Sequence, residues 1–336
     1  MAKYNGTKTP RNIYKEVSDR IVAAMEKGVV PWHQPWSNTS RSRYVRGMQD
    51  VSPFHNAKTG SPYRGLNIWL LSLASIGRWS DTRFCTYKQA TDMGGTVRKG
   101  EKGTMVILWK PMHTTVKDNN NQDVSRSWMM LRSFTVFNVE QCDNLKIPTR
   151  RTKTVEAIDE DDGTEDVTIT GFDTAQGILD AYVERENIKI NHGSNHACFY
   201  PGLDIIELPS PKQFKESAEY FSTAFHEITH STLMPDRCDR KGEFEAGVHK
   251  FGSYNYGQEE LVAEFGSAFL CSVAGIDSTV ENSAAYLSGW LKAIKEDEKL
   301  LISAAGRAQK ATDYILDIKP NYQKNDDDKE TSEDAE

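Results

Sequence analysis

Apolar side chains near the start of the chain recur every three or four residues, which is the spacing of one helix face. Thr9 and Pro10 ahead of this stripe are typical of an N-cap followed by proline at the first helical position, and Gly28 is a typical C-terminal stop. The apolar positions are Ile13, Val17, Ile21 and Ala24. The pattern predicts a helix that ends before Gly28.

Further along the N-terminal half, the pattern changes from helix to strand. Residues 29–62 are rich in Pro, Ser, Asn and Gly and predict a loop, whereas residues 65–76 predict a second helix. Apolar runs at 105–109 and 128–137 predict two strands, and the polar residues at 117–121 predict a turn between them. This mixture of elements predicts an α+β fold for the N-terminal half.

A charged segment divides the chain. Residues 149–168 are first basic and then acidic, with few side chains that could pack, and they predict a linker. Beyond it the expected elements are a helix at 174–185, strands at 197–200 and 204–208, a helix through 221–230, a helix at 258–273, and one or two helices within 284–318. The predicted organisation is a first domain at 1–148, the linker at 149–168, a mostly helical domain at 169–320 and a disordered acidic tail at 321–336.

The net charge of −7 over 336 residues conceals an asymmetry between the two halves. Residues 1–150 carry a net charge of +12, and residues 151–336 carry −19. A basic half joined to an acidic half indicates that the N-terminal part meets a polyanion.

Cysteine usage and hydropathy favour a cytoplasmic location. The five cysteines are odd in number and form no CxxC pair, which indicates reduced thiols and no thiolate zinc site. The first residues lack the apolar core of a signal peptide, and no run of 18 apolar residues predicts a membrane span. We therefore expect a cytoplasmic protein with no membrane partner.

The most specific chemical signal in the chain is the motif His226-Glu227-Ile228-Thr229-His230. Side chains at i and i+4 project from one helix face about a turn apart, so the two imidazoles can bind one zinc ion. The spacing is the signature of zinc metallopeptidases. We expect one zinc ion per chain, or another divalent metal, held by His226 and His230.

A catalytic zinc ion needs a third protein ligand and keeps its fourth position for water. Glu260 and Glu264 share one face of the helix predicted at 258–273. We assign Glu260 as the third ligand and Glu264 as the group that orients a histidine through its free ring nitrogen. The reverse assignment stays open, and Asp236 and His249 are rival ligands.

Peptide hydrolysis is the chemistry expected of these groups. Zinc lowers the pKa of its bound water to about 7 and polarises a carbonyl. Glu227 would act as the general base and return the proton to the leaving amine. The strand predicted at 204–208 is expected to hold an extended peptide by edge pairing.

The N-terminal half combines aromatic and basic residues. Six of the seven tryptophans lie within its first 150 residues. Bases that stack on aromatic rings, with Lys and Arg along the phosphates, are how proteins hold single strands without strict sequence preference. The candidate contact residues are Trp32, Trp36, Arg43, Arg46, Tyr63, Arg64, Asn67, Tyr87, Lys88, Arg98, Lys99 and Lys102. The alternative for each tryptophan is a place in the core.

Several ordered blocks carry a family resemblance. They are Val29-Val30-Pro31-Trp32, Tyr63-Arg64-Gly65-Leu66-Asn67, Thr86-Tyr87-Lys88-Gln89-Ala90, Val97-Arg98-Lys99-Gly100-Glu101-Lys102-Gly103, Val136-Phe137-Asn138-Val139-Glu140-Gln141, the motif at 226–230 and Glu259-Glu260-Leu261-Val262-Ala263-Glu264. Through these blocks the chain resembles the ArdC-type antirestriction proteins of plasmids and phages over roughly residues 10–300.

The resemblance implies an N-terminal domain that binds single-stranded DNA and a C-terminal zincin-like metallopeptidase domain. It also implies a role in protecting incoming DNA from host restriction. One segment departs from the family pattern, because Ser231-Thr232-Leu233-Met234-Pro235 replaces a more usual aromatic-Thr-Gly sequence. This departure concerns the turn after His230, whereas the two histidines and the glutamate of the motif are intact.

Three functions are compatible with these features. The first is a metallopeptidase tethered to single-stranded DNA. The second is a protein that shields single-stranded DNA and in which the zincin domain is structural or vestigial. The third is a soluble metallopeptidase that cleaves a host restriction, defence or regulatory protein, which the basic half would recruit.

Overall fold

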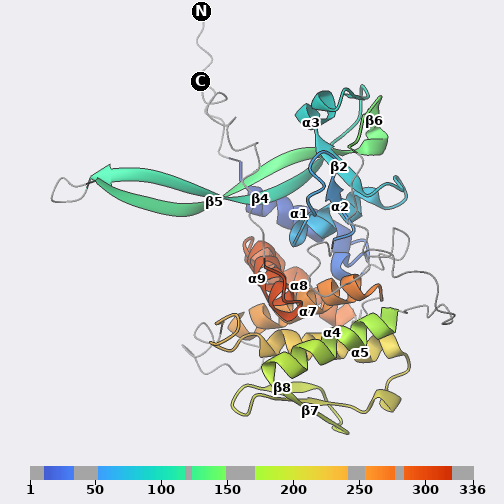
Figure 1. Ribbon diagram of the computed structural model, residues 1–336, viewed down its shortest axis with the longest axis vertical. Helices are drawn as coiled ribbons and strands as arrows, with labels where there is room; N and C mark the ends of the chain where they lie inside the picture. The colour runs from blue at the N-terminus through green and yellow to red at the C-terminus, as the bar shows by residue number, and fades with distance from the viewer. Residues whose placement is uncertain are drawn as a thin grey trace, which may run out of the picture.

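The computed structural model describes residues 11–33, 52–117, 123–148, 171–240, 254–276 and 284–319. The strand-rich N-terminal half lies at one end of the molecule, and the mostly helical C-terminal half lies at the other (Figure 1). A long hairpin projects sideways from the N-terminal half (Figure 1). This arrangement confirms the predicted α+β class. The predicted linker and tail lie outside the described residues.

The N-terminal half is built on one four-stranded sheet. Its elements are α1 (Ile13–Met25), a 3-10 turn (Pro31–His33), β1 (His55–Asn56), α2 (Leu66–Ser75), β2 (Arg83–Thr86), α3 (Tyr87–Asp92), β3 (Thr96–Val97), β4 (Thr104–Lys117), β5 (Asp123–Asn138), a 3-10 turn (Val139–Gln141) and β6 (Cys142–Asp143). The sheet order is β1-β2-β5-β4, and β3 pairs separately with β6. Strand β1 is parallel to β2, while β2, β5 and β4 are antiparallel neighbours.

Local sequence signals explain where these elements begin. The side chain of Asn12 accepts a hydrogen bond from the Lys15 backbone amide and caps α1. Thr86 and Gln89 form a reciprocal capping box at the start of α3. Strands β4 and β5 are longer than predicted, because residues 110–117 and 123–127, which lie beyond the predicted strands, are mostly polar and carry no regular apolar alternation.

The C-terminal half consists of helices around a small sheet. Its elements are α4 (Gly171–Glu186), β7 (Lys189–His192), β8 (Cys198–Tyr200), β9 (Ile205–Leu208), a 3-10 turn (Pro211–Gln213), α5 (Ser217–Ser231), α7 (Tyr254–Ala274), α8 (Ala284–Glu296) and α9 (Leu300–Ile315). The sheet order is β7-β9-β8. Strand β9 therefore has neighbours on both sides, so the peptide-binding edge expected at 204–208 is wrong, and β8 lies at an edge instead.

One hydrophobic core crosses the predicted domain boundary. The indole of Trp69 on α2 stacks on Phe269 of α7 with ring centroids 4.9 Å apart, and it meets Phe265 edge-on at 4.3 Å. The same core includes buried residues of α1 and α9. A second core lies within the C-terminal half between α4, α5 and the small sheet. Helix α7 borders both cores, so the residues it carries are held on two sides.

Candidate metal centre

Helix α5 presents the two histidines of the motif on one face. Its opposite face is buried through Phe221, Phe225 and Ile228, which pack in the C-terminal core. This amphipathic pattern fixes the rotation of the helix, as predicted. The rings of His226 and His230 lie with their centroids 4.7 Å apart and their Nε2 atoms 3.1 Å apart.

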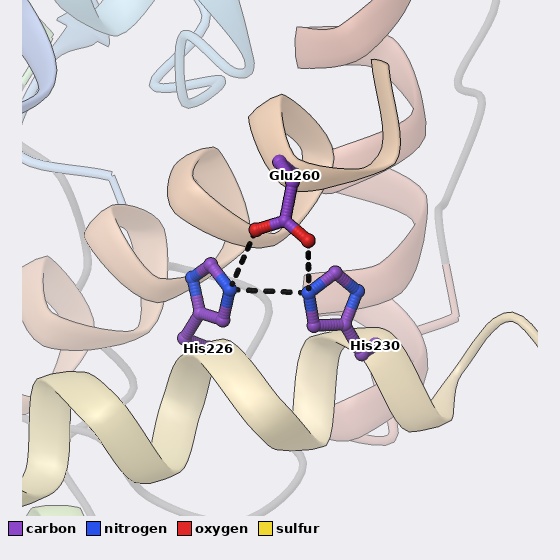
Figure 2. Close-up of side chains that lie close together, drawn as sticks. All are labelled: His226, His230 and Glu260. Atoms are coloured by element: carbon purple, nitrogen blue, oxygen red, sulfur yellow. Dashed lines mark hydrogen bonds and ion pairs between the residues drawn. The ribbon is translucent and has the colours of Figure 1, made fainter. Parts of the chain in front are cut away.

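The carboxylate of Glu260 reaches both histidines from α7 (Figure 2). Its Oε2 lies 3.4 Å from His226 Nε2, and its Oε1 lies 3.6 Å from His230 Nε2. Ligand-type atoms of His226, His230 and Glu260 all lie within 4.8 Å of one another. The structure thus brings together the three residues that the sequence predicts as metal ligands.

The spacing of these three side chains suits a tetrahedral zinc ion. Zinc bonds of about 2.0–2.2 Å to nitrogen and oxygen place neighbouring donor atoms roughly 3.3–3.6 Å apart. The observed separations between the two Nε2 atoms and the Glu260 oxygens are 3.1, 3.4 and 3.6 Å. Two neutral imidazoles and one carboxylate are also a ligand set that catalytic zinc sites use.

The electrostatics of the three residues favour a cation among them. Burial by itself lowers the pKa of His230, but its hydrogen bonds to Glu259 and Glu260 outweigh burial and raise that pKa to about 10. Burial opposes the charged form of Glu260 as well, yet hydrogen bonds from His226 and His230 hold its pKa well below the usual range. The carboxylates of Glu259 and Glu260 thus stabilise positive charge at the histidines, which is the charge that a divalent cation would bring.

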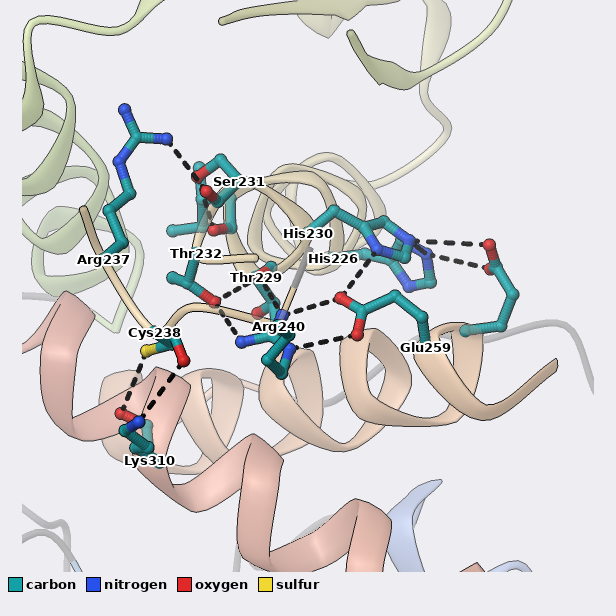
Figure 3. A network of polar contacts seen from close by, with 12 residues as sticks. His226, Thr229, His230, Ser231, Thr232, Arg237, Cys238, Arg240, Glu259 and Lys310 are labelled. Carbon is teal, nitrogen blue, oxygen red and sulfur yellow. Dashed lines mark hydrogen bonds and ion pairs between the residues drawn. The ribbon is translucent and has the colours of Figure 1, made fainter. Parts of the chain in front are cut away.

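Glu259 occupies the place that the sequence assigned to Glu264. Its Oε1 lies 3.4 Å from Nδ1 of His230 (Figure 3), whereas Glu260 approaches the other ring nitrogen, Nε2. Glu264 lies more than a turn further along α7, where it is buried. The expectation for Glu264 misjudged how α7 crosses α5, because residue 259 faces the second histidine directly.

Arg240 holds Glu259 in this position. Its Nη2 donates to Glu259 Oε1 at 2.6 Å, and its Nε donates to Oε2 at 3.0 Å. The same guanidinium donates to Thr232 Oγ1 at 2.8 Å and to the carbonyl oxygen of Thr229 at 3.2 Å (Figure 3). The side chains of Arg240 and Glu259 are 5 % and 7 % exposed, so this is a buried, fully hydrogen-bonded ion pair. It joins the end of α5 to α7.

Helices α5 and α7 approach closely beside the motif. A Cβ atom at Gly266 would lie 2.4 Å from Thr229 Cγ2, so a residue without a side chain is needed there. Ser267, the next residue of α7, donates to the carbonyl oxygen of Ser222 at 2.7 Å. These contacts bring the backbone of α7 near enough for Glu259 and Glu260 to reach the histidines.

The remaining residues predicted for the site are placed as follows. Glu227 is buried on α5, and this helix contacts β8. Asp236 is exposed in the turn after α5 and is absent from the cluster of ligand-type atoms. His249 lies outside the described residues.

Two aromatic residues predicted to contact DNA are packed inside the fold. Trp32 is 1 % exposed, and its ring centroid lies 4.9 Å from that of Phe265 and 5.9 Å from that of Trp69. Tyr63 meets Phe84 edge-on at 6.5 Å. Because Trp32 is buried against these rings, the prediction that it stacks on DNA bases is wrong.

Two polar residues from the same prediction tie elements together. Arg64 forms an ion pair with Asp313 of α9, across the boundary between the two halves. The side-chain amide of Asn67 donates to the carbonyl oxygen of Ile107 and accepts from its amide, both at 2.8 Å, which joins α2 to β4. Arg64 and Asn67 therefore have structural roles within the fold.

The other predicted DNA contacts are exposed or undescribed. Exposed positions are Tyr87, Lys88, Arg98, Lys99 and Lys102. Arg98 is engaged by carboxylates, at 3.0 Å from Glu101 and 3.5 Å from Asp143. Trp36, Arg43 and Arg46 lie outside the described residues.

Two family models match the two halves of the chain. Residues 11–137 match the N-terminal domain of anti-restriction factor ArdC, and residues 178–307 match a zincin-like metallopeptidase. The metal-free crystal structure of the antirestriction ArdC protein from the R388 plasmid is 31 % identical and superposes with a TM-score of 0.65, covering 92 % of this chain and 98 % of that one. The chain belongs to the ArdC antirestriction family.

Other relatives place this ArdC-type chain in a wider group. The Mn(II)-bound structure of the R388 ArdC protein is 32 % identical, with a TM-score of 0.63 over 93 % of this chain and all of that one. A DNA primase TraC of Escherichia coli is 33 % identical over 318 residues, which are 90 % of this chain and 27 % of the primase. An uncharacterized protein of Sinorhizobium fredii, y4eC, is 28 % identical over 331 residues, covering 95 % of this chain and 96 % of that protein.

The ArdC-type chain therefore spans only about a quarter of the primase that it matches. Among its described helices, none combines the length and apolar character needed to cross a bilayer.

Proposed function

We propose that the protein is a divalent-metal peptidase tethered to single-stranded DNA, which acts when incoming DNA is exposed to host restriction. The observation that carries the catalytic part is the convergence of His226, His230 and Glu260 on one point beside the buried Glu227. Zinc is the metal that best suits this ligand set, and manganese is the metal bound to the R388 relative.

The residues of the site have distinct roles in this proposal. A bound zinc ion supplies a water of lowered pKa and polarises a carbonyl group. Glu227 accepts a proton from the attacking water and returns it to the leaving amine. Glu259 accepts a hydrogen bond from Nδ1 of His230, which leaves Nε2 of that ring as the metal-binding atom.

The strand β8 is the proposed platform for a peptide substrate. It lies at an edge of the small sheet, antiparallel to β9, and contacts α5. The proposed base Glu227 lies on α5, the helix that β8 contacts. An extended peptide that adds to this edge would bring a carbonyl group close to the metal position.

Binding of single-stranded DNA is assigned to the N-terminal half. Its net charge of +12 over residues 1–150 and its tryptophans support this assignment, as does its membership of the ArdC N-terminal domain family. The target of cleavage is proposed to be a host protein that meets the DNA-bound chain. Tethering to the strand would raise the local concentration of the peptidase near such a target.

The test measures peptide hydrolysis and DNA binding on the same preparations. Replacement Glu227→Gln removes the base and keeps the metal ligands, so we expect hydrolysis of a casein or peptide-library substrate to be lost while metal content and DNA binding stay unchanged. The matched control is Glu184→Gln, an exposed carboxylate on α4, which should keep all three properties. Hydrolysis that survives in Glu227→Gln would contradict the proposed mechanism.

A second function is favoured by the excess positive charge of the N-terminal half. The chain would then shield single-stranded DNA, with no need for hydrolysis. In a restriction assay in cells, this function predicts full protection by Glu227→Gln, whereas the tethered peptidase predicts loss of protection with DNA binding intact.

A further inference from the structure

The hairpin of β4 and β5 extends well beyond the body of the protein. Strand β4 pairs with β5 along its whole length, from Thr104↔Val136 to Lys117↔Asp123. At about 3.4 Å per residue, the 14 residues of β4 make a ribbon roughly 45 Å long. Its base is packed in the shared core, Trp109 and residues 128–131 line an open hollow with residues 11–14 at the start of α1, and the strands continue outward beyond both halves (Figure 1). We call residues 108–117 and 123–132 of this hairpin the arm.

The arm carries more than half of the large hydrophobic residues that are exposed in the described chain. Five of the nine large hydrophobic residues that are exposed in the described chain belong to it: Leu108, Trp109, Val124, Trp128 and Met129. Trp128 is 44 % exposed and Trp109 is 41 % exposed. Exposed apolar side chains do not stabilise a two-stranded ribbon in water, because they are not buried. Clustered exposed apolar residues instead mark a surface that binds a partner.

The register of the ladder sorts the charges of the arm onto two different faces. Directly paired residues share a face, and successive pairs alternate between the two faces. One face carries the pairs Leu108↔Arg132, Lys110↔Met130, Met112↔Trp128 and Thr114↔Arg126. We call it the Trp128 face. Its three cationic side chains are accompanied by no carboxylate among the described residues.

The opposite face differs in charge. Among the residues whose side chains the structure describes, it carries Trp109 and one lysine or arginine, Lys117, which lies at its outer end. The two cations flanking Trp128 on its own strand are Arg126, two residues before it, and Arg132, four residues after it. They lie about 7 and 13 Å away along the strand. Positive charge on both sides of an exposed indole thus occurs on the Trp128 face.

We infer that the Trp128 face of the arm is the principal single-strand-binding surface, with an unpaired base stacked on Trp128 and phosphates beside Arg126 and Arg132. The inference rests on the proposed function, in which the chain binds single-stranded DNA. An exposed indole between cations is how single strands are held without base readout. A duplex keeps its bases stacked inside, so this face selects unpaired strands.

Two alternative surfaces in the same half are less suitable. Trp32 has no free ring face, because it is buried in the shared core. The cation Arg98 is opposed by the carboxylates of Glu101 and Asp143. A phosphate at Arg98 would have to displace a carboxylate, whereas Arg126 and Arg132 have no carboxylate paired with them in the described ladder.

The experiment compares variants of the two faces in binding a fluorescently labelled oligothymidylate by anisotropy. Loss of base stacking in Trp128→Ala should weaken binding about 5- to 150-fold. Trp128→Phe keeps an aromatic face and should recover much of the affinity, which separates stacking from any effect on folding. The matched control is Trp109→Ala, an equally exposed tryptophan on the opposite face, which should bind as the unaltered protein does.

Salt dependence tests the charged part of the inference. Each lost phosphate contact should reduce the slope of log affinity against log salt by about 0.7. We expect this reduction for Arg126→Gln and no reduction for its control Lys117→Gln on the opposite face. Far-UV circular dichroism and thermal midpoints establish that the variants are folded.

The outcomes distinguish this inference from the proposed function. If the unaltered protein fails to bind the oligonucleotide at low salt, the proposed DNA-binding function is wrong. If it binds, and Trp128→Ala and Arg126→Gln bind equally well, the arm inference alone is overturned. Loss of binding in Trp109→Ala with retention in Trp128→Ala would place the strand on the other face and would also overturn it.

Discussion

Glu259 has two roles: it accepts a hydrogen bond from the metal ligand His230, and it forms a buried ion pair with Arg240. Mutations of this pair can separate the effect on zinc affinity from the effect on the free energy of unfolding. The perturbation is Glu259→Leu, which removes the acceptor for His230 Nδ1 and also leaves Arg240 without its carboxylate. Arg240 would keep its bonds to Thr232 and Thr229 and lose the two to Glu259. A buried charge would then be only partly compensated.

Two magnitudes follow from this geometry. Removal of one partner from a buried ion pair costs about 3–5 kcal/mol of unfolding free energy. Loss of the group that orients a metal-binding histidine lowers metal affinity about 10- to 100-fold. We expect both effects in Glu259→Leu. Stability is measured by urea unfolding in the presence of a chelator, and zinc affinity by competition with a chelating dye.

The double replacement Arg240→Met and Glu259→Leu distinguishes the two effects. It removes both charges from a buried site, and such replacements are often neutral or stabilising. We expect the unfolding free energy to return close to that of the unaltered protein while zinc affinity stays low, because His230 still lacks its acceptor. As a comparison on the same helix, Glu264→Gln should retain most of the zinc affinity. The reasoning is refuted if Glu259→Leu binds zinc normally, or if the double variant recovers affinity together with stability.

Two further predictions concern the packing that supports the site. Gly266→Ala should lower the unfolding free energy by about 1–3 kcal/mol in urea, because its Cβ would overlap Thr229, whereas Gly177→Ala, in open space on α4, should be neutral or stabilising. Arg64→Met should destabilise the protein at neutral pH by about 1–3 kcal/mol, because it leaves the ionised Asp313 without a cation, and with the hydrogen bond from Gln309, in a site where burial already raises the pKa of that carboxyl. The raised pKa means that the deficit should shrink as the pH falls and Asp313 takes up a proton, and a deficit that does not depend on pH would contradict this explanation.

The motif residues were predictable because their geometry is local. Two histidines four residues apart on an amphipathic helix must share a face, whatever the rest of the fold does. Glu260 was predictable for a related reason. The apolar stripe of its helix shows which face points to the core, and Glu260 lies beside that stripe. The helices α1 and α2 and the inner parts of β4 and β5 were likewise encoded in short patterns, although the cap of α1 is Asn12 and not the predicted Thr9.

The remaining features depend on how distant segments meet. Whether residue 259 or 264 faces His230 is decided by the crossing of α5 and α7 at Gly266, which no spacing within α7 reveals. Arg240 belongs to no recognisable sequence motif. It can pair with Glu259 because the turn after α5 brings it back beside α7. Composition identified the tryptophans of the basic half but could not assign Trp32 to the core and Trp128 to the surface.

The most direct test of the metal centre is a crystal of the protein soaked with zinc and measured at the zinc absorption edge. The account predicts one strong anomalous peak per chain, about 2.0–2.2 Å from Nε2 of His226, Nε2 of His230 and a carboxylate oxygen of Glu260. A peak coordinated by Glu264 or Asp236 in place of Glu260, or no peak between the two histidines, would contradict it.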